Sequence, residues 1–524
     1  MKTSLFYNAR IFPSVHSHPF HWLIAQNGRV TVLGREKDEI PRLPIEARFD
    51  LQGRVVIPAF GDAHVHSLWA AKAFMEIDLS GAQSLAEALN ILKESKTRYQ
   101  PGQWVVGRGF NKNRWKDGVP ARVLLDRIFP QNPVYLESQD CHSAWVNSLA
   151  FTNVGVKENT PDPPGGRFLR EPEGAFSGLV LDRAMERFKN ALPAPDEQQL
   201  LQALDRFVGQ LLTNGITSIH TMEGAQAFSL WEKYFLRFGR KMRVVFYFPQ
   251  EEMDELIKSG LYSGYGDPWL RIGGIKFFSD GSLGSQTAAM RQPYENQPDN
   301  MGLLLFNEDE LLERVKRAES HRLATAIHAI GDRAVQLVLK VLQQTAALRK
   351  QHGLVSRIEH AQLVPPDLLP LFRQYGLAAS MQPIHIADDV EIADRYWGER
   401  SRFAYPFRSL REINVPLAFG SDAPVAPADP LKGIFSAVFR KSRFQLSKPT
   451  WTVEEALDVR QAVQAFTEGV AQAADSSAFQ GSLLTGKWAD FIVLSDDIFN
   501  MPAERMLSVK VEKTILDGSI VHAV

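Results

Sequence analysis

Six residues of the types that bind metals or transfer protons follow β-rich, apolar segments of this 524-residue chain. His64 and His66 flank one valine. Residues two apart in an extended segment point to the same side, so both imidazoles can reach one metal ion. Neutral imidazole and carboxylate suit zinc and its neighbours. The candidate metal ligands are His64, His66, Lys276, His328, His360 and Asp422.

The chemistry expected from this set is hydrolysis by a metal-activated hydroxide. A catalytic metal keeps a position open for water, whose pKa it lowers towards about 7, and two metals roughly 3.5–4 Å apart would need a bridging anion. A buried lysine has a depressed pKa, and in its neutral form it can react with CO₂. The carbamate formed on Lys276 would supply the bridge. Asp422 would bind metal, take the proton of the attacking water and pass it to the leaving group.

Taken singly, these residues have simpler explanations. A lone HxH pair arises more often by chance than as a metal site, and a lysine in a buried strand is usually a satisfied structural charge. Asp422, in the segment GSDAP, would serve equally well in a turn or as a helix cap, and His220, in SIHTMEG, as a core histidine. The metal site is favoured by the conjunction of ligand-type residues at strand ends in a chain with βα periodicity.

The elements that must position these residues are eight apolar segments, most of them separated by helix-period segments. Near-continuous apolar runs are typical of parallel strands buried on both faces. Two of the predicted helices open with capping-box patterns, at Asn307 with Glu310 and at Thr452 with Glu455. The predicted strands span 55–60, 215–220, 243–248, 272–278, 323–329, 356–362, 377–382 and 415–422.

Eight such units predict an α/β protein with a (β/α)₈ TIM-type barrel, whose active site lies at the C-terminal ends of the strands. About 150 residues separate the first two predicted strands, where roughly 20–40 would suffice, so an α/β insertion is expected after the first strand. The insertion should contain a helix that opens at Ser84, with Glu87 in a capping box, and the strands QWVVGRGF and NPVYLES.

Both ends of the chain have the pattern of short strands and turns, including a hairpin signal at Asn27-Gly28. Because chain termini often lie close together, we expect one composite β-sandwich, with two separate β appendages as the alternative. The predicted domains are the composite sandwich at 1–55 plus 480–524, the metal-dependent barrel at 56–69 plus 206–479 and the inserted subdomain at 70–205.

Composition narrows the classes of function. The formal net charge of -1 lacks the basic excess of a nucleic-acid-binding protein. The single cysteine, Cys141, excludes an intramolecular disulfide and a CxxC zinc knuckle, and fits a reducing compartment. We find no signal peptide and no membrane-length apolar run. We therefore expect a cytoplasmic protein that acts on a small molecule and has no nucleic acid or membrane partner. A homodimer is compatible with the sequence.

Longer motifs resemble those of a known family over nearly the whole chain. VIPAFGDAHVH, IKFFSDGSLGSQTA, AIHAIGDRAV, RIEHAQ and AFGSDAPVAPADPL are similar to signatures of the amidohydrolase superfamily. Within it, GRGFNKNRW and PPGGRFLREPEG resemble the insertion of the amidohydrolase-3 group, the YtcJ-like and N-substituted formamide deformylase-like branch. The resemblance implies that the four histidines and Asp422 bind one or two divalent metals, and that Lys276 is a carboxylated bridge. Zinc is the first expectation, with iron or manganese as alternatives.

The resemblance also implies residues around the substrate, Trp145 among them. Trp115 and Trp145 would suit an apolar or ring-bearing substrate, or would serve only to pack the lid. Asp280 would serve equally well as a cap of its glycine-rich turn. Cys141 stands where the group usually has Gly, and Asp182 where it commonly has Glu; both bear on substrate preference more than on catalysis. The candidate substrate-binding residues are His142, Trp145, Asn147, His220, Asp280, Arg333, Gln382 and Trp115.

The function expected from the sequence is hydrolysis of a C–N bond other than a peptide bond, of the amide type and N-formyl or N-acyl in particular. Ester or phosphoester hydrolysis and deamination stay open as alternatives, because a fold does not fix a function. A non-catalytic metal-binding scaffold is a further alternative. A sugar- or nucleotide-binding barrel would bind no transition metal. Loops frame the pocket, so the sequence leaves the substrate unnamed.

Overall fold

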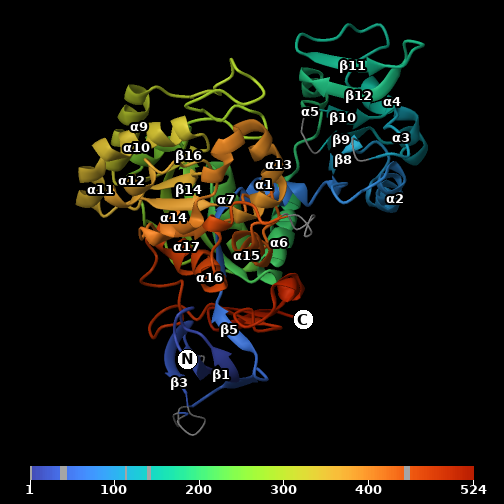
Figure 1. Ribbon diagram of the computed structural model, residues 1–524. Helices are drawn as coiled ribbons and strands as arrows, with labels where there is room; N and C mark the ends of the chain where they lie inside the picture. The colour runs from blue at the N-terminus through green and yellow to red at the C-terminus, as the bar shows by residue number, and fades with distance from the viewer. Residues whose placement is uncertain (1–2, 36–39, 41–43, 113–114, 139–142, 442–448) are drawn as a thin grey trace. The chain divides into compact units, whose positions relative to one another are not determined.

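The computed structural model describes residues 3–35, 40, 44–112, 115–138, 143–441 and 449–524. The chain forms two compact units, which Figure 1 shows in the colours of the sequence. The first unit consists of residues Met1–Ala70 and Asp205–Val524 and contains the barrel and the strands of both chain ends. The second unit is the insertion, residues Ala71–Leu204.

The barrel is an 8-stranded parallel sheet in the order β19-β18-β17-β16-β15-β14-β13-β6. A parallel bridge between Val65 and Ala423 brings the two edges of this sheet together. The strands are buried along most of their length, as expected where helices cover the outer face. They are β6 (Phe60–Val65), β13 (Ile216–Thr221), β14 (Arg243–Pro249), β15 (Leu270–Phe278), β16 (Ala324–Ala329), β17 (Arg357–His360), β18 (Ala378–Met381) and β19 (Leu417–Phe419).

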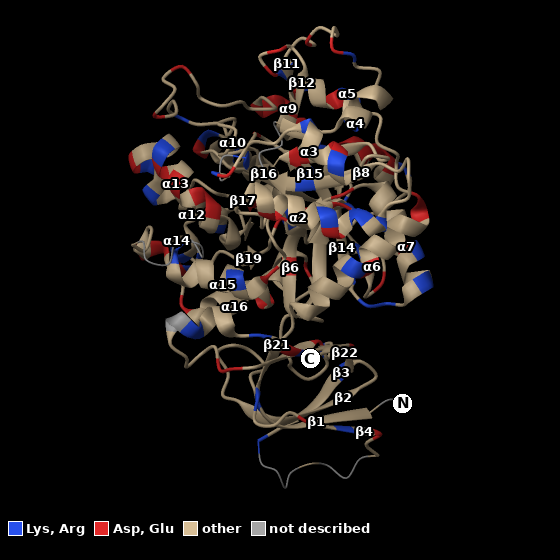
Figure 2. Cartoon of the chain, turned by 90° about the vertical axis from the view of Figure 1, so that its right-hand side faces the viewer, with Lys and Arg blue, Asp and Glu red and all other residues tan. Residues whose placement is uncertain are grey.

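Helices surround the barrel, and Figure 2 shows that Lys, Arg, Asp and Glu lie mainly on them, with both signs interspersed. The predicted capping box at Asn307 is confirmed, because the Asn307 side chain accepts from the Glu310 N–H and the Glu310 carboxylate accepts from the Asn307 N–H. The helices of this unit are α1 (Ser67–Ala73), α6 (Glu197–Thr213), α7 (Ala225–Phe238), α8 (Met253–Lys258), α9 (Glu308–Ser320), α10 (Asp332–Gln344), α11 (Ala346–His352), α12 (Leu369–Gln374), α13 (Ile386–Trp397), α14 (Phe407–Glu412), α15 (Pro430–Phe439), α16 (Val459–Phe466) and α17 (Glu468–Ala473).

The first predicted barrel strand, 55–60, is wrong. Residues Val55–Pro58 form β5, which pairs with the strands of the chain ends, and the barrel strand begins only at Phe60. Pro58 has no N–H to continue a ladder, and the strand β5 ends there although the apolar run continues to Phe60. The true strand, FGDAHV, is fully buried although it contains two polar residues. The more continuously apolar segment belongs to the sheet of the chain ends, and the less apolar one to the barrel.

The predicted helix start at Thr452 is also wrong. Thr452 has a left-handed backbone, with φ of 41°, and its side chain caps nothing. A short 3-10 turn follows, and the helix α16 begins only at Val459. Its capping box is made by Asp458 and Gln461. Two box patterns, at 452–455 and 458–461, lie close together in the sequence, and local spacing could not decide between them.

The two chain ends form one 8-stranded sheet, in the order β22-β21-β20-β5-β1-β2-β3, with β4 beside β1. The predicted hairpin at Asn27-Gly28 is confirmed: both residues have positive φ and join β2 to β3. A buried ion pair between Arg243 and Asp490, 2.6 Å apart, connects this sheet to the barrel. The strands are β1 (Thr3–Ile11), β2 (Phe20–Gln26), β3 (Arg29–Gly34), β4 (Ala47–Asp50), β5 (Val55–Pro58), β20 (Phe491–Leu494), β21 (Val511–Leu516) and β22 (Ser519–Ala523).

The inserted unit has its own 6-stranded sheet, in the order β11-β12-β10-β9-β8-β7. Ser84 caps the predicted helix by accepting from the Glu87 N–H, but the Glu87 carboxylate bonds to the Gln83 N–H and completes no capping box. The strands are β7 (Ile77–Asp78), β8 (Val105–Phe110), β9 (Val134–Ser138), β10 (Ser143–Val146), β11 (Gly166–Arg170) and β12 (Phe176–Asp182), and the helices are α2 (Leu85–Ser95), α3 (Arg122–Ile128), α4 (Ser148–Asn153) and α5 (Glu186–Lys189). The predicted fold class, a barrel with a composite terminal β domain and an α/β insertion, is confirmed.

Candidate metal centre

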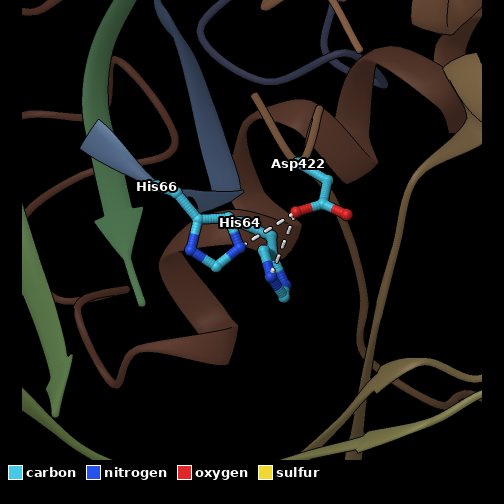
Figure 3. A group of neighbouring side chains, drawn as sticks. All are labelled: His64, His66 and Asp422. Carbon is cyan, nitrogen blue, oxygen red and sulfur yellow. Dashed lines mark ion pairs between the residues drawn. The ribbon is translucent and has the colours of Figure 1, made fainter. Parts of the chain in front are cut away.

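Two histidines and one aspartate meet where β6 ends beside the segment that follows β19. The Asp422 N–H donates to the His64 carbonyl over 2.7 Å, and the His66 N–H donates to the Ala423 carbonyl over 2.8 Å. These backbone bonds hold the Asp422 side chain against both imidazoles. Its Oδ1 lies 3.5 Å from Nε2 of His64 and 3.2 Å from Nε2 of His66 (Figure 3).

This group fits a divalent metal. The three side chains each offer one ligand atom, and these atoms lie within 4.8 Å of one another. Two imidazole nitrogens and one carboxylate oxygen form a donor set that suits zinc and related metals. His64 is 1% exposed, whereas the His66 side chain is 20% exposed. The group is therefore reached from solvent on the His66 side.

Two further histidines stand next to this group, at the ends of β16 and β17. The rings of His64 and His360 have centroids 4.9 Å apart, and those of His328 and His360 are 4.5 Å apart. Burial lowers the pKa of His64 to about 4 and that of His328 to about 3, and it holds the pKa of His360 well below its usual value. The rings are therefore neutral at physiological pH, as ligands must be.

Each of three imidazoles has one nitrogen bonded to an oxygen that can only accept. Nδ1 of His64 lies 2.6 Å from a Glu359 carboxylate oxygen, Nδ1 of His360 lies 2.8 Å from the Gln382 amide oxygen, and Nε2 of His328 lies 2.9 Å from the Gly281 carbonyl. The bonded nitrogen must carry the hydrogen, so the other nitrogen keeps a lone pair. Oxygen acceptors of this kind commonly orient histidine ligands of metals.

Lys276 projects from β15 into the same cluster and is 2% exposed. Its Nζ has no hydrogen-bond partner among the described residues. Burial lowers its pKa to about 8, although Glu359 and Asp422 act in the opposite direction. A buried amine that bonds to nothing is costly, so this position is explained by a bound group that the amine, or a derivative of it, would contact.

Sequence analysis missed the positioning residue Glu359. It is fully buried and joins His64 to the Arg357 guanidinium, whose Nε lies 2.5 Å from the second carboxylate oxygen. Burial alone would raise the pKa of Glu359, but Arg357 and His64 hold it below its usual range. Arg357 in turn donates to the Ala63 carbonyl and contacts Nδ1 of His220 at 2.8 Å. The signal in the sequence was a glutamate directly before His360, within a predicted barrel strand.

Replacing Glu359 by Gln is expected to weaken metal binding by about 10–100-fold, because the amide no longer offers His64 a charged acceptor. The measurement is the metal dissociation constant, obtained by competition with a chelator. Glu319→Gln is the matched control, since Glu319 is also fully buried and paired with an arginine, Arg349. Equal losses of metal affinity in both variants would assign Glu359 a general structural role.

Four of the predicted substrate-binding residues lie in the unit that contains the barrel. Gln382 is buried and orients His360, and its Nε2 has no partner among the described residues. Asp280 accepts from the backbone N–H groups of Ala289, Ile330 and Gly331, so it fixes the loops beside His328. The Arg333 side chain is exposed in the first turn of α10. Roles in substrate binding for these residues, and for the fully buried His220, stay predictions.

The predicted residues of the insertion lie within its own unit. Trp115 and Trp145 are 6% and 0% exposed and pack against each other in its core. The Asn147 side chain caps α4 and also bonds to backbone groups around β9. These contacts leave the three side chains little surface for a bound molecule, and their role in substrate binding stays a prediction. His142 and Cys141 lie outside the described residues.

The fold and the site define a class: an α/β-barrel protein with a histidine-rich metal centre at the C-terminal ends of its strands. The sequence profile described as the amidohydrolase family matches residues 48–522. The chain belongs to the amidohydrolase family, within the group predicted from its motifs, and is a metal-dependent hydrolase of that superfamily.

Individual relatives agree with this assignment. YtcJ of Bacillus subtilis (strain 168) is 30% identical over 487 residues, which cover 91% of each chain. The N-substituted formamide deformylase of Arthrobacter pascens is 25% identical over 519 residues, covering 95% of this chain and 94% of its own. An uncharacterized metal-dependent hydrolase from Pyrococcus horikoshii OT3 superposes with a TM-score of 0.79 at 27% identity, over 96% of this chain and 99% of that one. Among the described residues, no helix is long and apolar enough to cross a membrane.

Proposed function

We propose that this protein hydrolyses an amide-type C–N bond of a small molecule, with N-formyl and N-acyl amides as the first candidates. The observation that carries the proposal is the set of three oriented imidazoles whose remaining nitrogens keep lone pairs beside Asp422 and Lys276. The relative named N-substituted formamide deformylase supports the choice of bond.

The residues that would hold one or two divalent metals are His64, His66, Lys276, His328, His360 and Asp422. A metal bound there would supply Lewis acidity, which polarises a carbonyl and makes water more acidic. Zinc is the first candidate, with iron and manganese as alternatives, because imidazole and carboxylate suit all three.

For Lys276 we propose carboxylation. The neutral amine forms a bond from Nζ to the carbon of CO₂ and releases one proton, which leaves a carbamate with one negative charge. The buried Nζ beside the imidazoles, which has no hydrogen-bond partner in the part of the chain that the structure describes, supports this step. A protonated lysine cannot bind a metal. Its carbamate would offer oxygen ligands of the type that bridges two cations.

Asp422 is the proposed proton carrier. Burial would raise the pKa of its carboxyl, but His64 and His66 hold it well below the usual range, so the group is ionised. In the proposed cycle it takes a proton from the water that attacks the carbonyl carbon. It then gives that proton to the nitrogen as the C–N bond breaks, and the products are a carboxylic acid and an amine.

The experiment that tests the function is a substrate panel on protein of known metal content. We expect hydrolysis of at least one N-formyl or N-acyl amide, and loss of that activity after removal of the metal by a chelator, with recovery on adding zinc. The panel includes esters, phosphoesters and exocyclic amines, so hydrolysis or deamination of these alone would replace the C–N proposal. Loaded protein that turns over none of the substrates would favour the scaffold alternative.

A further inference from the structure

Two aromatic rings stand beside the ligand cluster with much of their surface exposed. Trp69 is 52% exposed, and its ring lies 5.8 Å from the ring of His66. Phe278 is 42% exposed, and its ring lies 5.3 Å from that of His328 and 4.9 Å from Nζ of Lys276. Large exposed apolar surface next to a reactive centre is a mark of ligand binding.

The backbone that carries Trp69 is firmly held. Glu223, which follows β13, accepts hydrogen bonds from the Leu68 and Trp69 N–H groups and from the Ser67 hydroxyl. The first N–H groups of a helix have no partners within it, and a carboxylate there also favours the helix dipole. The exposed indole therefore extends from a fixed point beside His66.

The backbone that carries Phe278 is held in the same way. Phe278 is the last residue of β15 and lies opposite His328 in the parallel pairing of β15 with β16. The next residue, Ser279, donates its N–H and its hydroxyl to the His328 carbonyl. The backbone that carries the aromatic ring is therefore held beside His328.

An exposed aliphatic side chain accompanies each ring. Val425 is 59% exposed, and its N–H donates to the Asp422 carbonyl in the segment joined to the end of β6. Leu305 is 48% exposed, and its N–H donates to the Ser279 carbonyl. We call Trp69 with Val425 the first apolar wall, and Phe278 with Leu305 the second.

The two walls lie on different sides of the barrel mouth. The first wall follows β6 and the adjoining edge at β19, and the second follows β15. Two strands, β13 and β14, separate β6 from β15 in the barrel. The ligand cluster lies between the walls, because His66 and Asp422 belong to one side and His328 and Lys276 to the other. A substrate with its reacting bond at the cluster would meet an apolar surface in two directions.

We propose that the two walls bind apolar, ring-sized groups on the two sides of the hydrolysed bond, so that both the acyl and the amine part of the substrate are apolar. This inference rests on the proposed function, whose substrate it specifies. A carboxylate against these rings would lose its hydration without gaining a partner, which disfavours substrates with an anionic group at either wall. An apolar ring that covers an exposed aromatic or aliphatic side chain removes apolar area of both from water.

The test uses metal-loaded protein and two pairs of hydroxamates, which chelate metals without requiring turnover. Acetohydroxamate and 3-phenylpropionohydroxamate differ on the acyl side. N-methyl- and N-benzyl-acetohydroxamate differ on the nitrogen side. We expect the phenyl member of each pair to bind at least about tenfold more tightly by calorimetry. Trp69→Ala should remove the preference in one pair, and Phe278→Ala in the other.

Tyr265→Ala is the matched control, because Tyr265 is 50% exposed and lies beside the opposite end of β15. It should keep both preferences. Any of three results would overturn the proposal. These are equal affinity within the pairs, no binding of any probe, and preferences that survive in both wall variants. The proposal would also be overturned if the wall variants kept both preferences but changed their mass in solution. That result would mean that the walls form a contact between two copies of the chain. Preferences without hydrolysis of any amide would contradict the proposed function alone.

Discussion

Asp422→Asn is expected to lower kcat by about 10²–10⁴-fold, the usual contribution of a positioned acid–base group. The amide is nearly the same size as the carboxylate but cannot accept a proton from water at neutral pH. KM should change less, because the apolar parts of the substrate do not contact this side chain. The measurement is steady-state kinetics on the best substrate of the panel, with the metal content of each preparation determined beforehand.

Asparagine is the right replacement because of the backbone. Asp422 has φ of 61°, in the left-handed region, where Asn and Asp are better tolerated than other residues with side chains. The matched control is Asp475→Asn, which changes the same side chain at an exposed position with φ of 49°. It should leave kcat unaltered. An Asp422→Asn enzyme that is fully loaded and retains kcat within about threefold would rule out the proton-carrier role.

The ligand cluster was predictable because its members are rare residue types at the ends of regular elements. His328 ends its predicted strand within one residue, and His360 ends its strand in the structure. In a parallel barrel the strand ends meet at one mouth, so sequence order alone was enough to bring these side chains together. The expectation needed no knowledge of loops.

The orientation of the ligands was not predictable in this way. Glu359 contacts His64 across 295 residues of sequence, and Arg357 contacts His220 across 137. In β17, Arg357 and Glu359 are two residues apart and therefore share a face, but this alternation does not tell which side chains of other strands lie opposite them. The left-handed backbone at His360, with φ of 69°, is likewise set by the surrounding structure.

The aromatic residues show a second limit. Trp115 and Trp145, the predicted substrate contacts of the insertion, pack in the core of that unit, and their role in substrate binding stays a prediction. Trp69 and Phe278 lie within three residues of predicted ligands and are exposed. Burial separates the two pairs, and burial of a tryptophan depends on its tertiary neighbours rather than on its own sequence context.

Lys276→Ala is expected to reduce the bound metal from about two per chain to about one or fewer, since two adjacent cations need a bridging anion. Loss of a residue that only orients a metal ligand costs roughly 10–100-fold in activity. Because Lys276→Ala removes a direct ligand, activity should fall by at least that factor. Elemental analysis and kinetics on protein produced with added bicarbonate measure both effects. Metal content and activity equal to those of the wild type would exclude the carbamate.

A paired variant makes this experiment specific for the missing carboxylate. Lys276→Ala leaves a space in which acetate or propionate can bind and act as the bridge, so these anions should restore part of the metal content and the activity. Lys276→Met fills the same space with an unbranched apolar chain, and the anions should restore nothing. Rescue of both variants would mean that the carboxylates act elsewhere. Rescue of neither, with one metal retained in each, would favour a single-metal site built on the histidines and Asp422.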